Sequence, residues 1–311
     1  MHFLLVGPGA LGCLLSSVVS KGMGSEDRLT ILDYNSDRAT YLNKEGIGYH
    51  LEEQLVPVPV KAVSDPLLLD PVDVVVLCVK SYDVIGSLEF CKPILSKETL
   101  LVFMQNGISH LDLHQHLHEA SAAFGTTTEG ATLLGRGQVR HAGSGVTFLG
   151  SLEPLDKRGA TVLQRTHDVF SAGGLEVHLT SNILARLWAK LFVNAGINAL
   201  TASLGCRNGE LLTLPGIDKR METAVREAMQ VAMKKGIAIS DEPCQTTRLV
   251  CQKTEKNISS MLQDVRNKRR TEIDAINGAV ITQARLLGID TPENSLLYNQ
   301  IKEIEAGYGR Q

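Results

Sequence analysis

The chain has 311 residues, of which 43% are hydrophobic and 21% charged, and its formal net charge is −3. This length predicts about two domains, and the composition is that of an ordinary globular protein, not a disordered or membrane one. The small net charge gives no electrostatic reason to expect nucleic acid or an anionic membrane as a partner. Six cysteines without a CxxC pair indicate reduced packing residues of a cytoplasmic protein. We expect neither a signal peptide nor a run of transmembrane length.

The chain begins with an apolar run, residues 2–6, followed by a glycine-rich turn and an apolar helical segment. The turn consists of Gly7, Pro8, Gly9, Ala10, Leu11 and Gly12. Gly-x-Gly-x-x-Gly between a strand and a helix is the dinucleotide-binding fingerprint, in which the backbone and the helix N-terminus receive a pyrophosphate. Glycines at these spacings also form unoccupied turns, but the position directly after a first strand favours a nucleotide site.

A second strand, residues 29–33, ends in an acid about twenty residues after the glycines. Folds of this kind place a carboxylate there on the ribose hydroxyls of NAD. Asp33 could equally be a helix cap or a turn residue. NADP would require a nearby basic side chain, and Arg38 is the only close candidate. Taken by itself, Asp33 favours NAD.

The next segments predict further strands of one parallel sheet. Residues 46–50 and 56–61 indicate short strands beside it, the prolines confining the second to an edge. The fully apolar run 72–79 leads to Lys80, and the run 100–104 leads to Gln105 and Asn106. Because open α/β sheets bind ligands at the carboxyl ends of their strands, we expect these polar groups to face a ligand.

A helix is predicted after Gly107, with His110, His114, His116 and His118 on it. The histidines suggest a metal site, but no second cluster of ligands accompanies them, so a solvated histidine face and no metal is the better interpretation. We then predict a hairpin over residues 137–145 that carries His141, a helix over 156–173 and a closing strand over 175–179.

After residue 180 the pattern becomes helical throughout. Lys190, Asn194 and Asn198 recur at i, i+4 and i+8, so they form one polar stripe on a helix whose other positions are mostly apolar. Burial of an ammonium and two amides without partners costs several kcal/mol. The stripe is therefore either an internal hydrogen-bond network or the wall of a cleft for a small, oxygen-rich ligand.

Three further helices are predicted in this half. One spans residues 217–236, a second begins at Thr271 with Glu272 in its first turn, and a third ends near Tyr308. A cluster of small polar residues, which includes Asn257 and Ser260, lies between the first two. Glu272 has a simple structural interpretation as a carboxylate at a helix N-terminus.

Together these segments resemble the ketopantoate reductase (2-dehydropantoate 2-reductase) family, and the resemblance runs nearly end to end. The matching segments are the glycine-rich turn, Val79-Lys80, Asn106-Gly107, His141 to Gly145, Lys190-x-x-x-Asn194-x-x-x-Asn198, Asn257 to Asp264 and Thr271 to Gly278. The turn occurs in many dehydrogenases, whereas the last three segments together are specific.

The resemblance implies a Rossmann domain over residues 1–179 and an all-α domain over 180–311, similar to the C-terminal domain of 6-phosphogluconate dehydrogenase, with the active site between them. It implies NADPH-dependent reduction of ketopantoate in pantothenate biosynthesis. Our own expectation for the assembly is a monomer or homodimer. Lys190 would be the general acid, and Glu272 would position the substrate and the lysine. Asn106, Asn194, Asn198, Asn257 and Ser260 would hold the substrate, while the glycine-rich turn, Asp33, Lys80, Asn106 and Glu272 would serve the cofactor.

Asp33 departs from the family pattern, because many members carry a basic residue there; the cofactor is therefore expected to be NADP, with NAD as the alternative. Two other functions remain open. A related 2-oxo acid reductase would keep Lys190 and Glu272 but differ around Asn257. A non-catalytic nucleotide-binding module would not need the complete set of lysine, amides and carboxylate.

Overall fold

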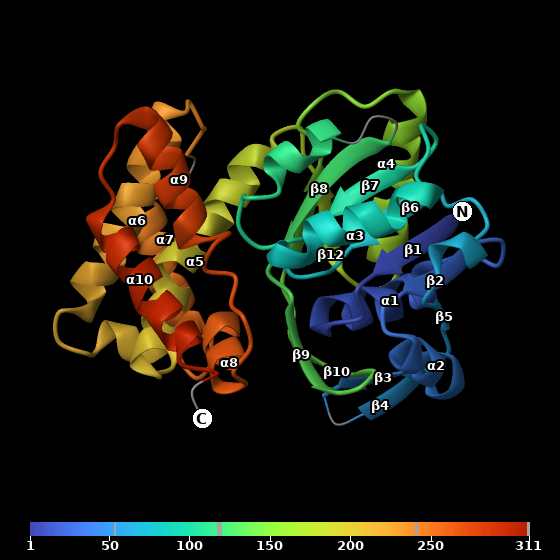
Figure 1. The fold of residues 1–311 in the computed structure, drawn as a ribbon, viewed down its shortest axis with the longest axis horizontal. Helices are drawn as coiled ribbons and strands as arrows, with labels where there is room; N and C mark the ends of the chain where they lie inside the picture. The colour runs from blue at the N-terminus through green and yellow to red at the C-terminus, as the bar shows by residue number, and fades with distance from the viewer. Residues whose placement is uncertain (53, 117–119, 240–241, 310–311) are drawn as a thin grey trace. The chain divides into compact units, whose positions relative to one another are not determined.

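The computed structural model describes residues 1–52, 54–116, 120–239 and 242–309 (Figure 1). The chain forms two compact units. One comprises Met1–Gln105 and Asp112–Ile183, and the other comprises Asn106–Leu111 and Leu184–Gln311. A short segment that precedes residue 112 thus packs with the C-terminal unit. The predicted domain boundary between residues 179 and 180 stays a prediction.

The first unit contains an eight-stranded sheet in the order β12-β11-β8-β7-β6-β1-β2-β5. Its strands are β1 (His2–Val6), β2 (Arg28–Leu32), β5 (Lys61–Val63), β6 (Val74–Leu77), β7 (Leu100–Phe103), β8 (Ser121–Thr127), β11 (Val146–Gly150) and β12 (Glu176–Leu179). In this spatial order, the strands from β8 through β7, β6, β1 and β2 to β5 are parallel to one another, and β11 is antiparallel to β8. The strand order reverses beside β1, which makes the ends of β1 and its neighbours the place where such a sheet binds a nucleotide.

A second, four-stranded sheet has the order β4-β3-β10-β9. Its strands are β3 (Ile47–Leu51), β4 (Gln54–Val58), β9 (Gly130–Gly135) and β10 (Gln138–Gly143). Strand β4, which contains Pro57, lies at an edge as its proline predicts. The predicted hairpin over residues 137–145 is wrong in its extent: residues 138–143 form the single strand β10, which turns back on β9 around Gly137.

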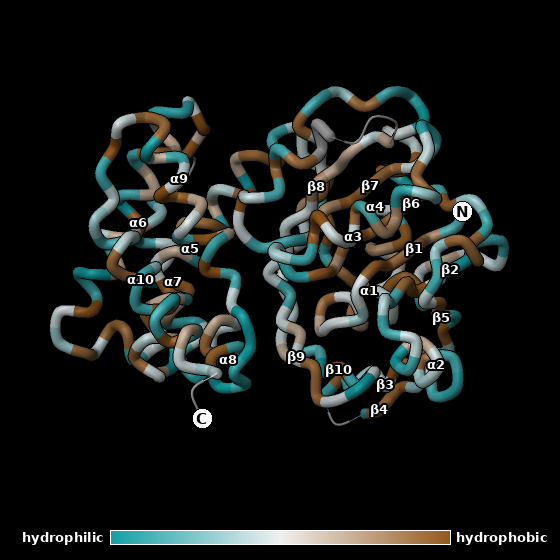
Figure 2. Tube along the Cα trace, in the orientation of Figure 1, coloured by the Kyte–Doolittle hydropathy of each residue, from teal (hydrophilic) through white to brown (hydrophobic). Residues whose placement is uncertain are grey.

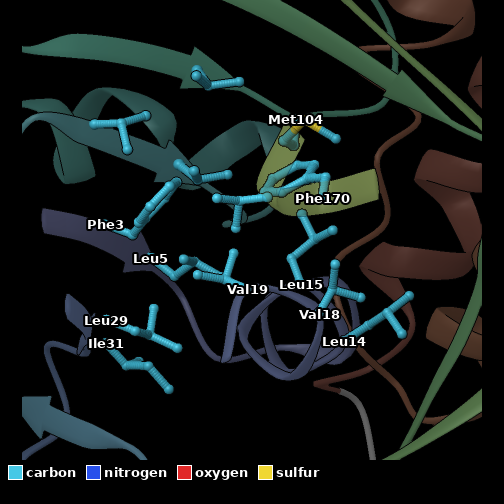
Figure 3. Packing of buried hydrophobic residues seen from close by; sticks show 14 of the residues in the cluster. Phe3, Leu5, Leu14, Leu15, Val18, Val19, Leu29, Ile31, Met104 and Phe170 are labelled. Carbon is cyan, nitrogen blue, oxygen red and sulfur yellow. The ribbon is translucent and has the colours of Figure 1, made fainter. Parts of the chain in front are cut away.

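Among the described residues of this unit, four α-helices accompany the sheets: α1 (Ala10–Gly22), α2 (Ser36–Glu45), α3 (Val84–Cys91) and α4 (Lys157–Ala172). Helices α1 and α4 approach so closely that a Cβ on Gly22 would lie 2.0 Å from the Val169 carbonyl oxygen. Leu15 and Val18 of α1 and Phe170 of α4 belong to one apolar cluster, which Figure 3 shows. The central strands are apolar along most of their length, as Figure 2 shows, because both faces of the sheet are covered.

Short 3₁₀ turns occupy several connections: η1 (Pro66–Leu68), η2 (Ser81–Asp83), η3 (Lys92–Ile94) and η4 (Leu111–His116). The last replaces the α-helix predicted after Gly107. His110 is fully buried, so the prediction of a solvated histidine face is wrong for this residue. His118 lies outside the described residues.

The second unit is helical. It contains α5 (Ile183–Leu204), η5 (Asn208–Leu212), α6 (Ile217–Lys234), α7 (Pro243–Lys253), α8 (Ser260–Arg266), α9 (Asn277–Leu287) and α10 (Pro292–Ala306). Helix α5 lies against α6, where a Cβ on Gly196 would come within 2.8 Å of Val225. A buried carboxylate, Glu227, accepts hydrogen bonds from the backbone N–H groups of Glu293 and Asn294 and so caps α10.

Helix α5 is long and apolar enough to cross a membrane by length and composition, so the expectation that no segment reaches that length is wrong. More than half of the relevant window is buried within the protein. Because the central helix of a globular unit meets the same criteria, the burial indicates a core helix.

The helix predicted to begin at Thr271 begins six residues later, at Asn277. Residues 272–276 instead form a turn in which the Glu272 carbonyl oxygen accepts hydrogen bonds from the N–H groups of Ala275 and Ile276, both at 3.1 Å. Glu272 is therefore not in the first turn of a helix, and the interpretation of its carboxylate as a partner of the helix dipole is wrong.

Candidate active site

The glycine-rich turn connects β1 to α1 at the carboxyl edge of the main sheet. Gly7 has a φ of +90°, which L side chains rarely adopt, and a Cβ on Gly12 would lie 2.1 Å from the Gly7 carbonyl oxygen. A Cβ on Gly9 would meet no atom within 4 Å, and the α1 N-cap supplies no side-chain hydrogen bond. The backbone N–H groups of the first turn of α1 thus keep an open approach, as binding of a pyrophosphate requires.

Asp33 follows β2 and its carboxylate is fully buried. Arg38 on α2 binds both carboxylate oxygens, through Nε to Oδ2 and through Nη2 to Oδ1 at 2.6 Å. This pairing raises the pKa of the Arg38 guanidinium, and one third of the arginine side chain stays exposed. Position 33 therefore presents a neutralised pair with a partly exposed arginine, not an isolated negative charge.

Lys80 and Gln105 follow β6 and β7 at the same edge of the sheet. Lys80 is half-buried, and its carbonyl oxygen accepts a hydrogen bond from the Asp83 N–H. The Gln105 amide donates to the carbonyl oxygens of Leu77 and Val79 at 2.9 and 3.2 Å, which ties the ends of the two strands together. Gln105 has a structural role that its position in the sequence did not distinguish from ligand binding.

Asn106 begins the short segment that packs with the helical unit. The next residue, Gly107, has a φ of +78°, and a Cβ there would lie 2.0 Å from the Ala275 carbonyl oxygen. The Ile108 N–H donates to the same oxygen at 3.2 Å. The segment is therefore held against the turn that contains Glu272.

Lys190, Asn106 and Glu272 form a continuous polar chain in the helical unit. The Lys190 ammonium donates to Asn106 Oδ1 at 2.9 Å, and Asn106 Nδ2 donates to Glu272 Oε2 at 3.0 Å. Donors and acceptors match along this chain: the ammonium donates to the amide oxygen, and the amide nitrogen donates to the carboxylate. Figure 1 shows α5, which carries the lysine.

The surroundings of Lys190 change its protonation chemistry. Burial among the apolar residues of α5 lowers the pKa of Lys190 to about 8, and the negative charge of Glu272 opposes part of this decrease. Trp188 and Leu191, its neighbours on α5, are almost fully buried. An amine with this pKa can hold a proton at neutral pH and release it to a developing alkoxide more readily than an ordinary lysine.

Asn194 and Asn198 continue the lysine stripe along α5, the first half-buried and the second buried. Thr201, three residues beyond Asn198, donates its hydroxyl proton to Ser259 Oγ at 2.7 Å. Ser259 also caps α8 by accepting from the Leu262 N–H. This contact holds the start of α8 against α5, and so places the exposed Ser260 near that end of the stripe.

Asn257 and Ser260 are both exposed in the structure. The Asn257 carbonyl oxygen accepts from the Asn208 N–H at 3.1 Å, which fixes the backbone before α8. Their side chains are thus available to a ligand. Thr201 and Ser259 were missed by the sequence argument, although a serine directly before an apolar helical run is a recognisable cap signal.

His110 is a further buried titratable residue, and it interacts electrostatically with Glu272. Burial lowers the pKa of His110 to about 4, and the charge of Glu272 opposes part of the decrease. The imidazole is therefore neutral at pH 7. Among the described residues, no group of three or more His, Cys, Asp or Glu side chains is arranged to hold a metal ion.

The strand order, the glycine-rich turn and the ammonium beside an amide and a carboxylate define a nicotinamide-dependent oxidoreductase with a Rossmann-type unit and a helical unit. Residues 3–154 match the family model described as Ketopantoate reductase PanE/ApbA, and residues 182–305 match the model of its C-terminal part. The chain belongs to the ketopantoate reductase family, which confirms the resemblance and the predicted α/β fold class.

Among curated proteins, the 2-dehydropantoate 2-reductase of Halobacterium salinarum is 34% identical over 298 residues, which cover 94% of this chain and 95% of that protein. The enzyme of the same name from Vibrio cholerae is 32% identical, with complete coverage of both chains. Among solved structures, a ketopantoate reductase from Ralstonia eutropha has a TM-score of 0.90 at 27% identity, covering 99% of this chain and 100% of that one.

A second kind of structural relative is a D-mandelate dehydrogenase in complex with NADH and anilino(oxo)acetate. It is 25% identical and has a TM-score of 0.89, and the match covers 99% of this chain and 100% of that chain. The fold is therefore shared by proteins described as a ketopantoate reductase and as a D-mandelate dehydrogenase.

Proposed function

We propose that the chain is a 2-dehydropantoate 2-reductase, which reduces the ketone of ketopantoate to the alcohol of pantoate with NADPH in pantothenate biosynthesis. The curated relatives, near full length, support this activity. The observation that carries the proposal is the Lys190–Asn106–Glu272 chain. It links the proton donor, Lys190, to the carboxylate of Glu272 through an amide, which is not itself an acid.

The nicotinamide cofactor supplies the hydride. As the ketone carbon is reduced, negative charge develops on its oxygen, which the Lys190 ammonium stabilises and then neutralises with its proton. Asn106 fixes the ammonium through its amide oxygen. Glu272, bound to the same amide, keeps the pKa of Lys190 from falling further, so that the amine stays protonated near neutral pH.

The uncharged polar groups on α5 and at the start of α8 suit a polar 2-oxo acid. Asn194 and Asn198 lie on the lysine side of α5, Asn257 precedes α8, and Ser260 is the first residue of α8. Amides and hydroxyls bind the oxygens of the carboxylate and the hydroxyl group without introducing a second acid near the reacting ketone. We assign these four residues to the substrate.

For the cofactor we propose NADPH. An unpaired carboxylate at Asp33 would favour NADH, but Arg38 neutralises that carboxylate while one third of the arginine side chain stays exposed. A guanidinium held by a buried acid is a suitable partner for a 2′-phosphate. The backbone N–H groups at the start of α1 would bind the pyrophosphate, and Lys80 would bind neighbouring groups of the cofactor.

The test is a steady-state assay of the purified chain with ketopantoate, with NADPH and NADH in parallel. A kcat/KM in the ordinary enzymatic range, about 10⁴ M⁻¹ s⁻¹ or more, supports the assignment. The same assay with 2-oxo-2-phenylacetate tests the alternative suggested by the D-mandelate dehydrogenase relative. A higher kcat/KM for the aromatic acid would replace the ketopantoate assignment.

We further propose a cytoplasmic enzyme that acts on a small molecule as a monomer or homodimer. The six cysteines are free, as expected in a reducing compartment. A ketopantoate reductase from Staphylococcus aureus is described as dimeric. Light scattering at assay concentrations distinguishes the two assembly states.

A further inference from the structure

The direction of the Glu272 carboxylate depends on a turn, because no regular helix fixes it. The residues on both sides of Glu272 are completely buried, Thr271 and Ile273 each being 0% exposed. Such a turn keeps one conformation only if its backbone groups are bound to something rigid. In this protein the rigid element is α10, a 15-residue helix.

Glu305, in the last turn of α10, binds the start of the Glu272 turn. Its Oε1 accepts hydrogen bonds from the Thr271 N–H at 2.6 Å and from the Thr271 hydroxyl at 2.7 Å. The Thr271 hydroxyl oxygen in turn accepts from the Ile273 N–H at 3.3 Å. The backbone on both sides of Glu272 is thereby connected to one carboxylate.

Helix α10 also binds the residue two positions after Glu272. Asp274 accepts from the Tyr298 hydroxyl at 2.9 Å, and Lys302 lies between Asp274 and Glu305, with its ammonium 3.0 Å from Glu305 Oε2. The Glu305 side chain is only 12% exposed, so these bonds are shielded from water.

The place of Glu305 is unfavourable for α10 itself. A carboxylate in the last turn of a helix faces the negative end of the helix dipole, so it does not stabilise that helix. Its hydrogen bonds go instead to the turn that carries Glu272. Glu305 therefore stabilises the turn that carries Glu272 and not the end of its own helix.

We propose that Glu305 is a positioning residue for the reductase, which orients the Glu272 carboxylate toward Asn106 through Thr271. This inference rests on the proposed function. Loss of the Glu305 carboxylate frees the backbone around Glu272, so that the Glu272–Asn106–Lys190 chain no longer keeps its geometry.

The first test is a double-mutant cycle with Glu305→Ala and Glu272→Ala, and Glu303→Ala as the control from the exposed side of the same helix. We expect Glu305→Ala to lower kcat/KM for ketopantoate about 10- to 100-fold, as small misplacements do. In the Glu272→Ala background the same change should have almost no further effect. An equal loss in both backgrounds, or no loss in either, overturns the proposal.

A second pair of variants makes smaller changes, so that misfolding does not obscure the result. Thr271→Val removes the hydroxyl but keeps the N–H bond to Glu305, whereas Thr271→Ser keeps both. We expect the valine variant to lose kcat/KM and the serine variant to retain it. Equal activity of the two variants counts against the relay through Thr271.

The second test needs no substrate. The pH dependence of Lys190 acetylation by acetic anhydride, followed by peptide mass spectrometry, reports the pKa of this amine. Because the Glu272 charge raises that pKa, its displacement in Glu305→Ala should shift the labelling curve to lower pH, as Glu272→Ala does. An unshifted curve overturns the proposal even if ketopantoate proves not to be the substrate, and a shifted curve supports it in that case too.

Discussion

Lys190 combines a charge with an apolar environment, and this combination is the basis of its proposed role. Replacement by methionine keeps the length of the aliphatic stem and removes the desolvated ammonium. We expect Lys190→Met to lower kcat by about 10²–10⁴, the usual contribution of a positioned proton donor. NADPH affinity and melting temperature should stay close to wild type, with exposed Lys256→Met as the control. A variant that loses stability but keeps its turnover per folded molecule would make Lys190 a structural residue.

The pKa of Lys190 also sets a pH dependence. The general acid must be protonated, and its pKa is about 8, so kcat/KM should decline above that pH. Glu272 raises this pKa by its negative charge. Glu272→Gln should therefore lower it and move the alkaline limb of the profile to lower pH. A limb that stays in place in this variant would mean that another group determines it.

Arg38 governs the choice of cofactor in our proposal. Arg38→Gln keeps an N–H donor for the buried Asp33 but removes the positive charge. Since a 2′-phosphate distinguishes NADPH from NADH, we expect KM for NADPH to rise at least about tenfold and KM for NADH to change little. Arg136→Ala, an exposed arginine in the same unit, is the control. Equal changes for both cofactors would remove Arg38 from the 2′-phosphate site.

At this scale the sequence predicted which candidate residues share a helix face, but not their contacts. The spacing of Lys190, Asn194 and Asn198 identified a shared helix face, because helical periodicity is local. The bond between Lys190 and Asn106 joins positions 84 residues apart, and no local pattern encodes it. Arg38 was identified as a basic neighbour of Asp33, but the spacing alone could not establish that the two are paired.

At the scale of elements, the glycine-rich turn separates a requirement of folding from a requirement of binding. A Cβ on Gly12 would meet the Gly7 carbonyl oxygen, whereas a Cβ on Gly9 has open space around it. We expect Gly9→Ala to keep the melting temperature of the unliganded protein but to weaken NADPH binding about tenfold or more, because the methyl group occupies the approach to the α1 N-terminus. Fluorescence titration and a thermal melt on one preparation measure both.

Gly12→Ala is the companion variant. It should lower the melting temperature as well, because the added atom collides with backbone. Undiminished NADPH affinity in Gly9→Ala would show that the turn is not the pyrophosphate site.

Periodicity in the sequence predicted the regular elements, but it did not predict the irregular turn that carries Glu272. The helix expected over residues 156–173 is observed as α4, with Asp156 accepting a hydrogen bond from the Gly159 N–H as its cap. The residues from Thr271 to Ile276 have a helical pattern, yet the contacts of Thr271 and Asp274 with α10 outweigh local propensity there. Such tertiary contacts lie beyond any window of neighbouring residues.

In the molecule as a whole, the assignment of Asn106–Leu111 to the helical unit was the feature least accessible from the sequence. These residues directly follow a strand of the sheet, and chain order alone places them with it. Gly107 fits close to the Ala275 carbonyl oxygen, and this contact between distant positions carries Asn106 and His110 into the helical unit.

The burial of His110 in this segment has a consequence for the stability of the whole protein. The pKa of His110 is about 4 in the folded state, against about 6.5 when the chain is unfolded. Between these values the unfolded state binds more protons, so the free energy of unfolding rises with pH, by up to about 1.4 kcal/mol per pH unit from this residue. Stability from a neutral His110 is thus complete above pH 6.5 and is lost as the pH falls toward 4.

We therefore expect His110→Gln to flatten the decrease of the urea unfolding free energy between pH 6.5 and pH 4.5, even if the variant is less stable at pH 7. His178→Gln, which replaces an exposed histidine, should leave the slope unchanged. The comparison of slopes removes the contributions of the other titrating groups, since these are common to all three proteins. Parallel curves for wild type and His110→Gln would mean that His110 has the same proton affinity folded and unfolded, which its complete burial contradicts.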